Sequence, residues 1–292
     1  MAKELPPGTT RFGCRVVAIT LDPSGSYPML KLHDGSVIKS KIVIGCDGAN
    51  SAISRYLGLK PTKVYEICAT RGFTNYPTGH GLNNELTRIR KGKIIVGRAP
   101  VDDNLVYWFV GENRAARDSD LSQDVELFGQ STVKTIKSMD PEIVEMIKNN
   151  DTSLTSILRY RHPWDILFCN FSKGNVVLAG DAMHVMGPFV EQGGSTAIED
   201  AVVLARCISR TMCGVDPTSG EQFMMWEQAA VAFEQYVRNR RRRLFWLALR
   251  IHLIGLLGEP STSTLACFIY SSLLVLLFHN FYGHAQYDCG NL

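Results

Sequence analysis

Short apolar runs alternate with turn residues along the first 45 positions of the chain. Runs of strand length occupy positions 14–21, 29–32 and 36–44, and Asp34-Gly35 separates the last two. Asp-Gly between two apolar runs is a strong signal for a β-hairpin. The pattern therefore predicts that this part of the chain is rich in β-structure and contains a hairpin.

The last of these runs leads into the first of two strand–turn–helix units. Ile42 to Ile44 continues into a polar turn at 45–48, which contains Asp47 and Gly48. A helix is predicted over 51–57, with Asn50 as its N-cap and Gly58 as its C-cap.

The second unit has the same order much later in the chain. An apolar run at 175–179 predicts a buried strand that ends in Gly180-Asp181, and Gly193-Gly194 precedes a helix. Thr196 and Glu199 have the spacing of a capping box. The predicted apolar face of the helix consists of Ile198, Ala201, Val202, Ala205 and Ile208. Open α/β sheets bind ligands at the carboxyl ends of their strands, and free amides at a helix start attract anions or carbonyl oxygens.

Between the two units the pattern changes to short strands, predicted at 94–96 and 105–110, followed by two helices. The first helix is predicted over 122–139 and the second from Asp140, with Pro141 in its first turn. Aromatic residues collect in this half of the chain: Phe73, Tyr76, Tyr107, Trp108, Phe109, Trp164 and Phe168. They suggest a sheet-backed pocket for a flat apolar substrate, with Trp108 as the leading candidate, whereas ordinary core packing is the alternative.

The C-terminal part is predicted to be helical. A helix over 221–243 would bury Phe223, Trp226, Phe233, Tyr236 and Val237. Arg238 and the run Arg240–Arg243 are interpreted as the solvated end of that helix. Apolar stretches at 244–257 and 265–278 follow, and each falls short of the ~20 residues that span a membrane. Packed or interfacial helices are predicted there, with membrane-surface contact as an alternative.

Composition narrows the function classes. The 292 residues are 45% apolar, enough for one large or two ordinary domains, and a net charge of +3 argues against a nucleic-acid partner. The eight cysteines form no C-x-x-C pair and have no histidine at metal-ligand spacing, so no metal site is expected. Reduced thiols and the lack of a visible signal or transit peptide predict an intracellular, cytoplasmic protein.

The two strand–turn–helix units also carry a known pattern. They contain Asp47-Gly48-x-x-Ser51-x-x-x-Arg55, Gly180-Asp181-Ala182-x-His184 and Pro188-x-x-x-Gln192-Gly193-Gly194. These motifs resemble the two later flavin-binding signatures of the FAD-dependent, aromatic-hydroxylase-type (class A) monooxygenases. The similarity is greatest to plant members that are salicylate-hydroxylase-like or zeaxanthin-epoxidase-like.

The resemblance implies an α/β fold. It combines an incomplete FAD-binding, Rossmann-like domain with an inserted mixed β-sheet substrate domain and a C-terminal helical region. The implied boundaries are 1–61 for the first FAD-binding part, 62–170 for the substrate domain, 171–210 for the second flavin motif and 211–292 for the helical region. Because both motifs must reach one cofactor, the strands at 42–46 and 175–179 are expected to lie side by side or close together in one sheet, with Asp47 and Asp181 at their carboxyl ends.

The resemblance further implies the chemistry and the site. NAD(P)H would reduce FAD, O₂ would be captured as a flavin hydroperoxide, and oxygen would pass to an aromatic or alkene carbon of a small apolar substrate. Asp181 would bind the ribityl chain and Arg55 the phosphate side. The remaining cofactor-binding residues would be Asp47, Gly48, Gly180, Pro188, Gln192, Gly193, Gly194 and Ser195. His184 is interpreted as a structural partner, and no residue is assigned as catalytic.

Two departures from the family pattern keep other functions open. No G-x-G-x-x-G motif for the FAD pyrophosphate occurs in the chain, and Glu191 stands where the family has a glycine before Gln192-Gly193. If that position requires a positive φ or a close approach, Glu191 costs about 1–3 kcal/mol there. The chain alone is therefore expected to retain little FAD. The alternatives are a non-catalytic remnant that binds a ligand or partner, and a peripheral membrane protein similar to an epoxidase.

Overall fold

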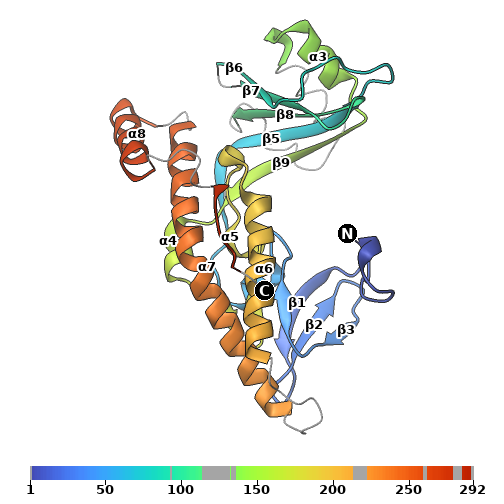
Figure 1. Ribbon diagram of the computed structural model, residues 1–292, viewed down its shortest axis with the longest axis vertical. Helices are drawn as coiled ribbons and strands as arrows, with labels where there is room; N and C mark the ends of the chain where they lie inside the picture. The colour runs from blue at the N-terminus through green and yellow to red at the C-terminus, as the bar shows by residue number, and fades with distance from the viewer. Residues whose placement is uncertain are drawn as a thin grey trace. The chain divides into compact units, whose positions relative to one another are not determined.

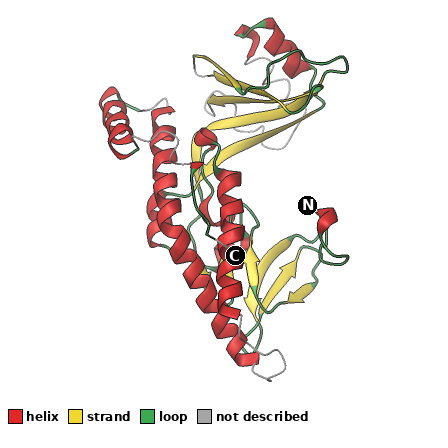
Figure 2. Cartoon of the chain, in the orientation of Figure 1, coloured by secondary structure: helices red, strands yellow, loops and turns green. Residues whose placement is uncertain are grey.

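The fold is seen in a computed structural model, which describes residues 2–92, 94–113, 132, 136–212, 222–258, 262–278 and 285–290. Its contacts divide the chain into two units, residues 1–63 with 159–292, and residues 64–158. Figure 2 shows that both units combine strands with helices, which is the predicted α/β class. Residues 159–170, assigned to the substrate domain by the sequence, lie in the first unit.

The first unit begins with a small antiparallel sheet. After a 3₁₀ turn at Ala2–Glu4, strands β1 (Val16–Leu21), β2 (Pro28–Leu32) and β3 (Val37–Lys39) pair in that order. Gly35 has a φ of +85° in the turn between β2 and β3, as the Asp-Gly signal requires. The predicted hairpin is confirmed.

A second sheet joins the two strand–turn–helix units. Strand β4 (Val43–Gly45) runs parallel to β11 (Val176–Leu178), with Val43 opposite Val176, and β10 (Ser172–Lys173) pairs with β11 on its other side. The prediction that these strands lie side by side is confirmed. Since parallel strands end at the same edge of a sheet, the turns after β4 and β11 meet at that edge.

Helices cover this sheet and complete the main core. Helix α1 (Ala52–Tyr56) follows β4, and α5 (Asp181–His184), the 3₁₀ turn η4 (Pro188–Val190) and α6 (Gly193–Met212) follow β11. The side chains of β11 are completely buried and pack with α6 and with the next helix. Strand β11 therefore has the continuous apolar sequence of a strand that is covered on both faces.

Helix α7 (Gln222–Gly258) is much longer than the helix predicted over 221–243. It packs along α6 and continues through the first C-terminal apolar stretch (Figure 1). Phe233, Tyr236 and Val237 are buried as predicted, whereas the side chains of Phe223 and Trp226 lie outside the described residues. Helix α4 (Pro163–Phe168) packs on the same helix.

The second unit is a five-stranded sheet, and within the described residues one of its faces is covered. Its strands are β5 (Lys63–Asn75), β6 (Thr87–Lys91), β7 (Ile94–Pro100), β8 (Leu105–Asn113) and β9 (Thr152–Tyr160), in the order β6-β7-β8-β5-β9. Helix α3 (Pro141–Lys148) and the 3₁₀ turn η3 (Ile136–Ser138) pack against it. Most of the helix predicted over 122–139 lies outside the described residues.

The last helix, α8 (Thr264–Leu277), lies beside the C-terminal part of α7, on the side away from α6 (Figure 1). It corresponds to the second C-terminal apolar stretch and has no buried residue. Within the described ranges, no helix combines the length and the hydropathy needed to cross a membrane.

Candidate functional site

The turn after β4 places Asp47 at the start of α1. Oδ2 of Asp47 accepts hydrogen bonds from the backbone N–H groups of Ala52, at 2.6 Å, and Ile53. Gly48 has a φ of +76°, which lets the chain turn between strand and helix. Asp47 is exposed, and its Oδ2 caps the start of α1.

Ser51, and not Asn50, is the N-cap of α1, because its Oγ accepts from the N–H of Ser54 at 2.8 Å. The carboxylate of Asp47 already shares the capping, so Asn50 is displaced into the turn. The predicted C-cap at Gly58 is also one position late: Leu57 is the C-cap, and Gly58 follows it with a φ of +74°.

Arg55 lies on the exposed surface of α1, in its last turn. One of its terminal nitrogens donates to the carbonyl oxygen of Asn50 at 3.1 Å. A guanidinium has five N–H groups, so this single bond leaves most of them for another acceptor. Arg55 can therefore meet an anion at the same end of the sheet as Asp47.

The turn after β11 depends on Gly180. Its φ of +59° and ψ of −146° form a conformation that only glycine adopts readily, and it starts helix α5. The N–H of Gly180 donates to Oδ2 of Asp200 at 2.8 Å. Asp181 follows directly, with its carboxylate exposed at the edge that the turn of Asp47 also reaches.

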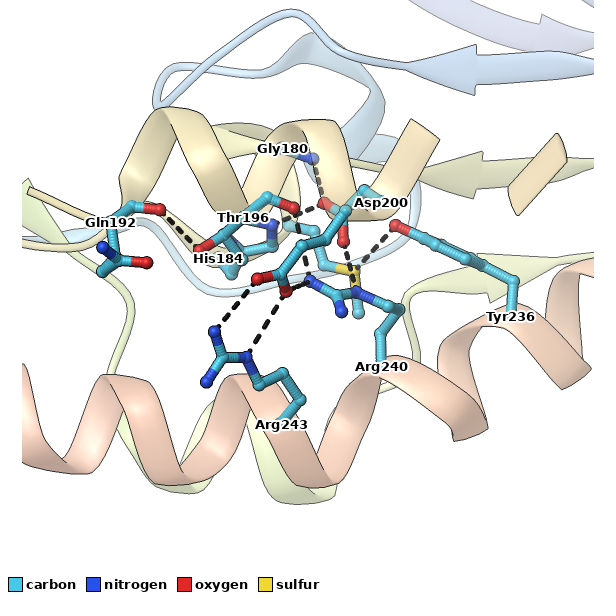
Figure 3. A network of polar contacts seen from close by, with 10 residues as sticks. Gly180, His184, Gln192, Thr196, Asp200, Tyr236, Arg240 and Arg243 are labelled. Carbon is cyan, nitrogen blue, oxygen red and sulfur yellow. Dashed lines mark hydrogen bonds and ion pairs between the residues drawn. The ribbon is translucent and has the colours of Figure 1, made fainter. Parts of the chain in front are cut away.

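A buried polar network connects this turn to α6 and α7 (Figure 3). Nε2 of His184 lies 2.6 Å from Oδ2 of Asp200, and Nε of Arg240 donates to Oδ1 at 2.7 Å. These three side chains are completely buried. His184 therefore has the structural role that the sequence indicated. Arg240 also binds Glu199, and the ring of Tyr287 covers its guanidinium at 4.8 Å.

Charge decides how this network titrates. Burial alone would raise the pKa of Asp200, but His184, Arg240 and the N–H of Gly180 together hold it below its usual value. Burial opposes the charge of Arg240 as well, and Asp200 and Glu199 nevertheless raise its pKa. The pair is therefore ionised and holds the Gly180 turn in place at neutral pH.

Three predictions about α6 and α7 are wrong: the solvated arginine run, the buried face of α6 and the capping box at its start. The run Arg240–Arg243 does not form a solvated helix end, since it lies in the middle of α7. Arg240 binds Asp200, Arg241 donates to the carbonyl groups at the end of α4, and Arg243 pairs with Glu199. Only Arg238 and Arg242 of this group are exposed.

The buried face of α6 is also different from the predicted one. It consists of Thr196, Asp200, Val203, Leu204 and Cys207, whereas Ile198 is 64% exposed. Asp200 is buried because it bonds to Gly180 and Arg240, so the buried face of α6 contains polar side chains. Nor do Thr196 and Glu199 form a capping box: the hydroxyl of Thr196 donates to the carbonyl of Gln192 within the helix.

Glu191 occupies the strained position that the sequence indicated. It ends the 3₁₀ turn η4 with a φ of +57° and a ψ of +25°. It is the one non-glycine residue with a positive φ in the described parts of the chain. Of the two reasons for a glycine at this position, a positive φ or a close approach, the structure shows the positive φ.

Helix α6 begins directly after Gln192 with open space in front of it. The N–H of Thr196 is bonded to the carbonyl of Gln192, so the amides of Gly193, Gly194 and Ser195 form the first turn, which has no acceptor within the helix. A Cβ atom built on either glycine would meet nothing within 4 Å. An electron-rich group can therefore approach these amides closely.

Trp108 lies in the core of the second unit. It is 1% exposed, packs on the face that α3 covers, and its Nε1 donates to Thr74 at 3.0 Å. Its neighbours on β8, Tyr107 and Phe109, point to the opposite face because side chains alternate along a strand. There the ring of Tyr107 lies 5.5 Å from that of the exposed Phe73.

Comparison with known proteins assigns the class. A family model for an FAD binding domain matches residues 1–219, so the chain belongs to this family. Similar proteins include FAD-dependent hydroxylases and monooxygenases, and the chain is by family an FAD-dependent monooxygenase, an oxidoreductase.

Two plant proteins illustrate the similarity. Monooxygenase 1 of Arabidopsis thaliana is 40% identical over 296 residues, which cover 100% of this chain and 73% of the relative. Monooxygenase 2 of the same plant is 31% identical over 299 residues, covering 100% of this chain and 72% of the relative. The chain thus matches part of these longer proteins.

Solved structures show the same fold. HpxO from Klebsiella pneumoniae, complexed with FAD and uric acid, superposes with a TM-score of 0.67 at 22% identity, over 90% of this chain and 62% of HpxO. PqsL from Pseudomonas aeruginosa, in complex with 2-aminobenzoylacetate, superposes with a TM-score of 0.60 at 18% identity, over 89% of this chain and 66% of PqsL. The chain spans less than two thirds of either structure.

Proposed function

We propose that this chain supplies the flavin-ring and substrate-binding parts of an FAD-dependent monooxygenase that acts on a small planar aromatic or apolar substrate. The observation that carries the proposal is the parallel pairing of β4 with β11. It brings the turns of Asp47 and Asp181 to one edge of one sheet, where ligands bind in open α/β folds.

The residues at this edge fit the parts of FAD. The exposed carboxylate of Asp181 can accept hydrogen bonds from the ribityl hydroxyl groups, and Arg55 can donate to the phosphates. The amides of Gly193 to Ser195 can donate to the carbonyl oxygens of the isoalloxazine ring, with the positive end of the α6 dipole behind them. The empty space in front of the two glycines admits the edge of a flat ring.

The remaining site residues determine the backbone conformation of the turns that present these groups. Gly48 and Gly180, each with a positive φ, set the direction of the two turns, and Pro188 opens the 3₁₀ turn before Glu191. When bound and reduced by NAD(P)H, FAD supplies the activation of O₂ and the transfer of one oxygen atom to an aromatic or alkene carbon. The protein contributes position and electrostatics.

The open face of the five-stranded sheet is the proposed substrate surface. Phe73, Tyr107 and Phe109 place their rings there, with centroid distances of 5.5 and 6.4 Å between neighbours. Flat rings stack favourably on such surfaces. The ligands of the compared structures, uric acid in HpxO and 2-aminobenzoylacetate in PqsL, are likewise small molecules. The buried Trp108 would support this surface from the opposite face of the sheet.

Flavin binding is the decisive test. We would titrate FAD into the 292-residue chain and into a fusion that places a βαβ unit of the family ahead of Lys3, and follow flavin fluorescence. The chain alone should bind weakly, because its sequence has no G-x-G-x-x-G loop for the pyrophosphate. The fusion should bind tightly, and Asp181→Ala should weaken its binding by roughly 10- to 100-fold, as about 1.5–3 kcal/mol predicts.

Asp103→Ala is the matched control, since Asp103 is also an exposed carboxylate but lies in the second unit. It should leave FAD affinity unchanged. A fusion that binds no FAD, or an Asp181→Ala variant with unchanged affinity, would contradict the proposed site.

A non-catalytic ligand-binding role is the second candidate, and Glu191 is the observation that favours it. A carboxylate beside the first turn of α6 would repel an electron-rich flavin, and its φ of +57° adds backbone strain. Oxygen consumption separates the two functions. NAD(P)H-dependent consumption by the FAD-loaded fusion supports the monooxygenase, whereas bound flavin without consumption supports the binding role.

A further inference from the structure

Helix α8 has apolar residues on every side, and its polar side chains are limited to the hydroxyl groups of Thr264, Tyr270, Ser271 and Ser272. Its 14 residues include no charged side chain and none that is buried. Leu265, Phe268, Val275 and Leu276 are 70–75% exposed. A helix that packs on a protein core buries one stripe and presents polar residues on its other side. Helix α8 lacks that division, which is typical of a helix in contact with hydrocarbon.

A series of aromatic rings extends the apolar surface of α8 onto α7 and α4. The ring of Phe278 lies 6.1 Å from that of Trp246, Trp246 lies 5.4 Å from Phe245, and Phe245 lies 5.5 Å from Trp164. Trp246 is 41% and Trp164 50% exposed, and Phe168 on α4 is also exposed. We call α8 with these five residues the aromatic ridge. Half-exposed tryptophans are common where a protein meets the boundary between lipid tails and water.

Positive charge adjoins the aromatic ridge. Of the arginines of α7, Arg240 and Arg243 are paired with buried or half-buried carboxylates of α6, whereas Arg238 and Arg242 are exposed. Arg242 is exposed one helical turn before Trp246, and Arg238 is exposed one turn earlier. No ion pair joins either of them to another residue in the described ranges. These guanidinium groups complement the phosphates of anionic lipid headgroups.

We propose that the aromatic ridge binds the surface of a lipid bilayer that contains anionic lipids, with α8 in the interface and Arg242 among the headgroups. The length of α8 fits this position. At 1.5 Å per residue it is about 21 Å long, shorter than the ~30 Å hydrocarbon core, so it lies in the interface and does not cross the bilayer. A protein partner would cover one side of α8, whereas lipid can cover all its exposed sides together.

Vesicle flotation of the 292-residue chain tests the proposal. Phosphatidylcholine vesicles, with and without phosphatidylglycerol, are the probes. The chain should float with both and partition more strongly with phosphatidylglycerol, and salt should reduce only that additional partitioning. Tryptophan fluorescence should shift to the blue as Trp164 and Trp246 leave water. Arg242→Glu should remove most of the preference for phosphatidylglycerol.

Matched variants locate the contact. Phe268→Lys with Leu276→Lys should lower the partition coefficient more than about tenfold, because it places two charges in the apolar surface of α8. Phe12→Lys with Val37→Lys changes two apolar residues in the N-terminal part of the chain that are also more than half exposed, and it should leave partitioning unchanged. Unfolding curves of both variants check that the fold is intact.

Three results would overturn the proposal. The first is a wild-type chain that stays at the bottom of the gradient with both vesicle types. The second is equal flotation of the Phe268→Lys/Leu276→Lys variant. The third is a wild-type dimer, seen by light scattering without vesicles, that this variant converts to a monomer while neither protein binds lipid. That outcome would assign the aromatic ridge to a second copy of the chain.

Discussion

Nε of Arg240 on α7 lies 2.7 Å from Oδ1 of Asp200 on α6, and both side chains are completely buried (Figure 3). The other oxygen of Asp200 accepts from the N–H of Gly180. The ion pair therefore connects the long helix α7 to the turn that presents Asp181. A change at Arg240, on a distant helix, should reach the proposed flavin site through one carboxylate.

We expect Arg240→Met to lower the free energy of unfolding by about 3–5 kcal/mol, because it leaves the buried carboxylate of Asp200 without the guanidinium that pairs with it. Urea denaturation measures the change. Arg242→Met, an exposed arginine two positions along the same helix, should change stability by less than about 0.5 kcal/mol. Combining Arg240→Met with Asp200→Asn should cost less than the sum of the single changes. An Arg240→Met variant as stable as the wild type would contradict a structural role for the pair.

Glu191→Gly should stabilise the chain by about 1 kcal/mol. Glycine adopts a φ of +57° without strain, and the relief of about 1–3 kcal/mol exceeds the entropy that glycine adds to the unfolded chain. In the fusion that carries a βαβ unit, the same change should tighten FAD binding about tenfold, because it also removes a negative charge.

Glu191→Gln separates the strain from the charge. It keeps the side-chain shape and the left-handed backbone, so stability should stay near that of the wild type while FAD affinity rises part of the way. If the glycine variant is less stable and binds FAD no more tightly, the loop has adapted to Glu191.

The sequence was most informative where structure depends on residues close together along the chain. Asp34-Gly35 signalled its hairpin, and each Asp turn after an apolar run signalled a strand end. The parallel pairing of β4 with β11 joins distant segments, but it followed from the resemblance, since both motifs have to reach one cofactor. The same resemblance singles out Glu191, because the family pattern has a glycine at its position.

The buried network could not be predicted from local pattern. Asp200 is buried because its partners come from α5, α7 and the Gly180 turn. A prediction from hydrophobic periodicity assigns every carboxylate to the surface of the helix, so it cannot find such a residue. The same rule assigns the charged side chain of Arg240 to the solvent-exposed surface. Pattern alone cannot decide between a pocket and a core position for Trp108, because alternation along β8 defines two faces and only the position of α3 decides which of them is covered.

Gly45 is a further position where the site depends on close packing. A Cβ at this residue would lie 2.7 Å from Cδ2 of Leu178 and 2.8 Å from Cβ of Ile53, so β11 and α1 approach the backbone of β4 directly. We expect Gly45→Ala to cost about 1–3 kcal/mol of stability and to weaken FAD binding by the fusion, because β4 leads into the Asp47 turn.

Gly111→Ala provides the matched comparison. Gly111 is also in a strand, but its Cβ would come no closer than 3.8 Å to a neighbour, which is an ordinary contact. Both substitutions reduce the freedom of the unfolded chain alike, so the difference between them measures the crowding at β4. Equal unfolding midpoints for the two variants would contradict that crowding.

His252 on α7 should make stability depend on pH. Its ring stacks on Tyr160 with centroids 5.1 Å apart and meets the ring of His162 at 5.0 Å. Burial, with the nearby charges of His162 and Lys63, lowers the pKa of His252 to about 4 from its usual 6.5. Between those values the unfolded chain binds a proton that the folded chain does not, so the free energy of unfolding falls as the pH falls from 6.5 towards 4.

The difference between these two pKa values corresponds to about 3 kcal/mol of unfolding free energy for a fully buried ring. Because His252 is partly exposed, solvent screening reduces this contribution to about 1–2 kcal/mol. His252→Phe keeps the stacked ring and removes the titration. The loss of stability between pH 7 and pH 5, measured in urea, should therefore be smaller in this variant by roughly 1 kcal/mol. His33→Phe, at an exposed position, should keep the wild-type loss. An unchanged loss in His252→Phe would show that other groups cause the acid sensitivity.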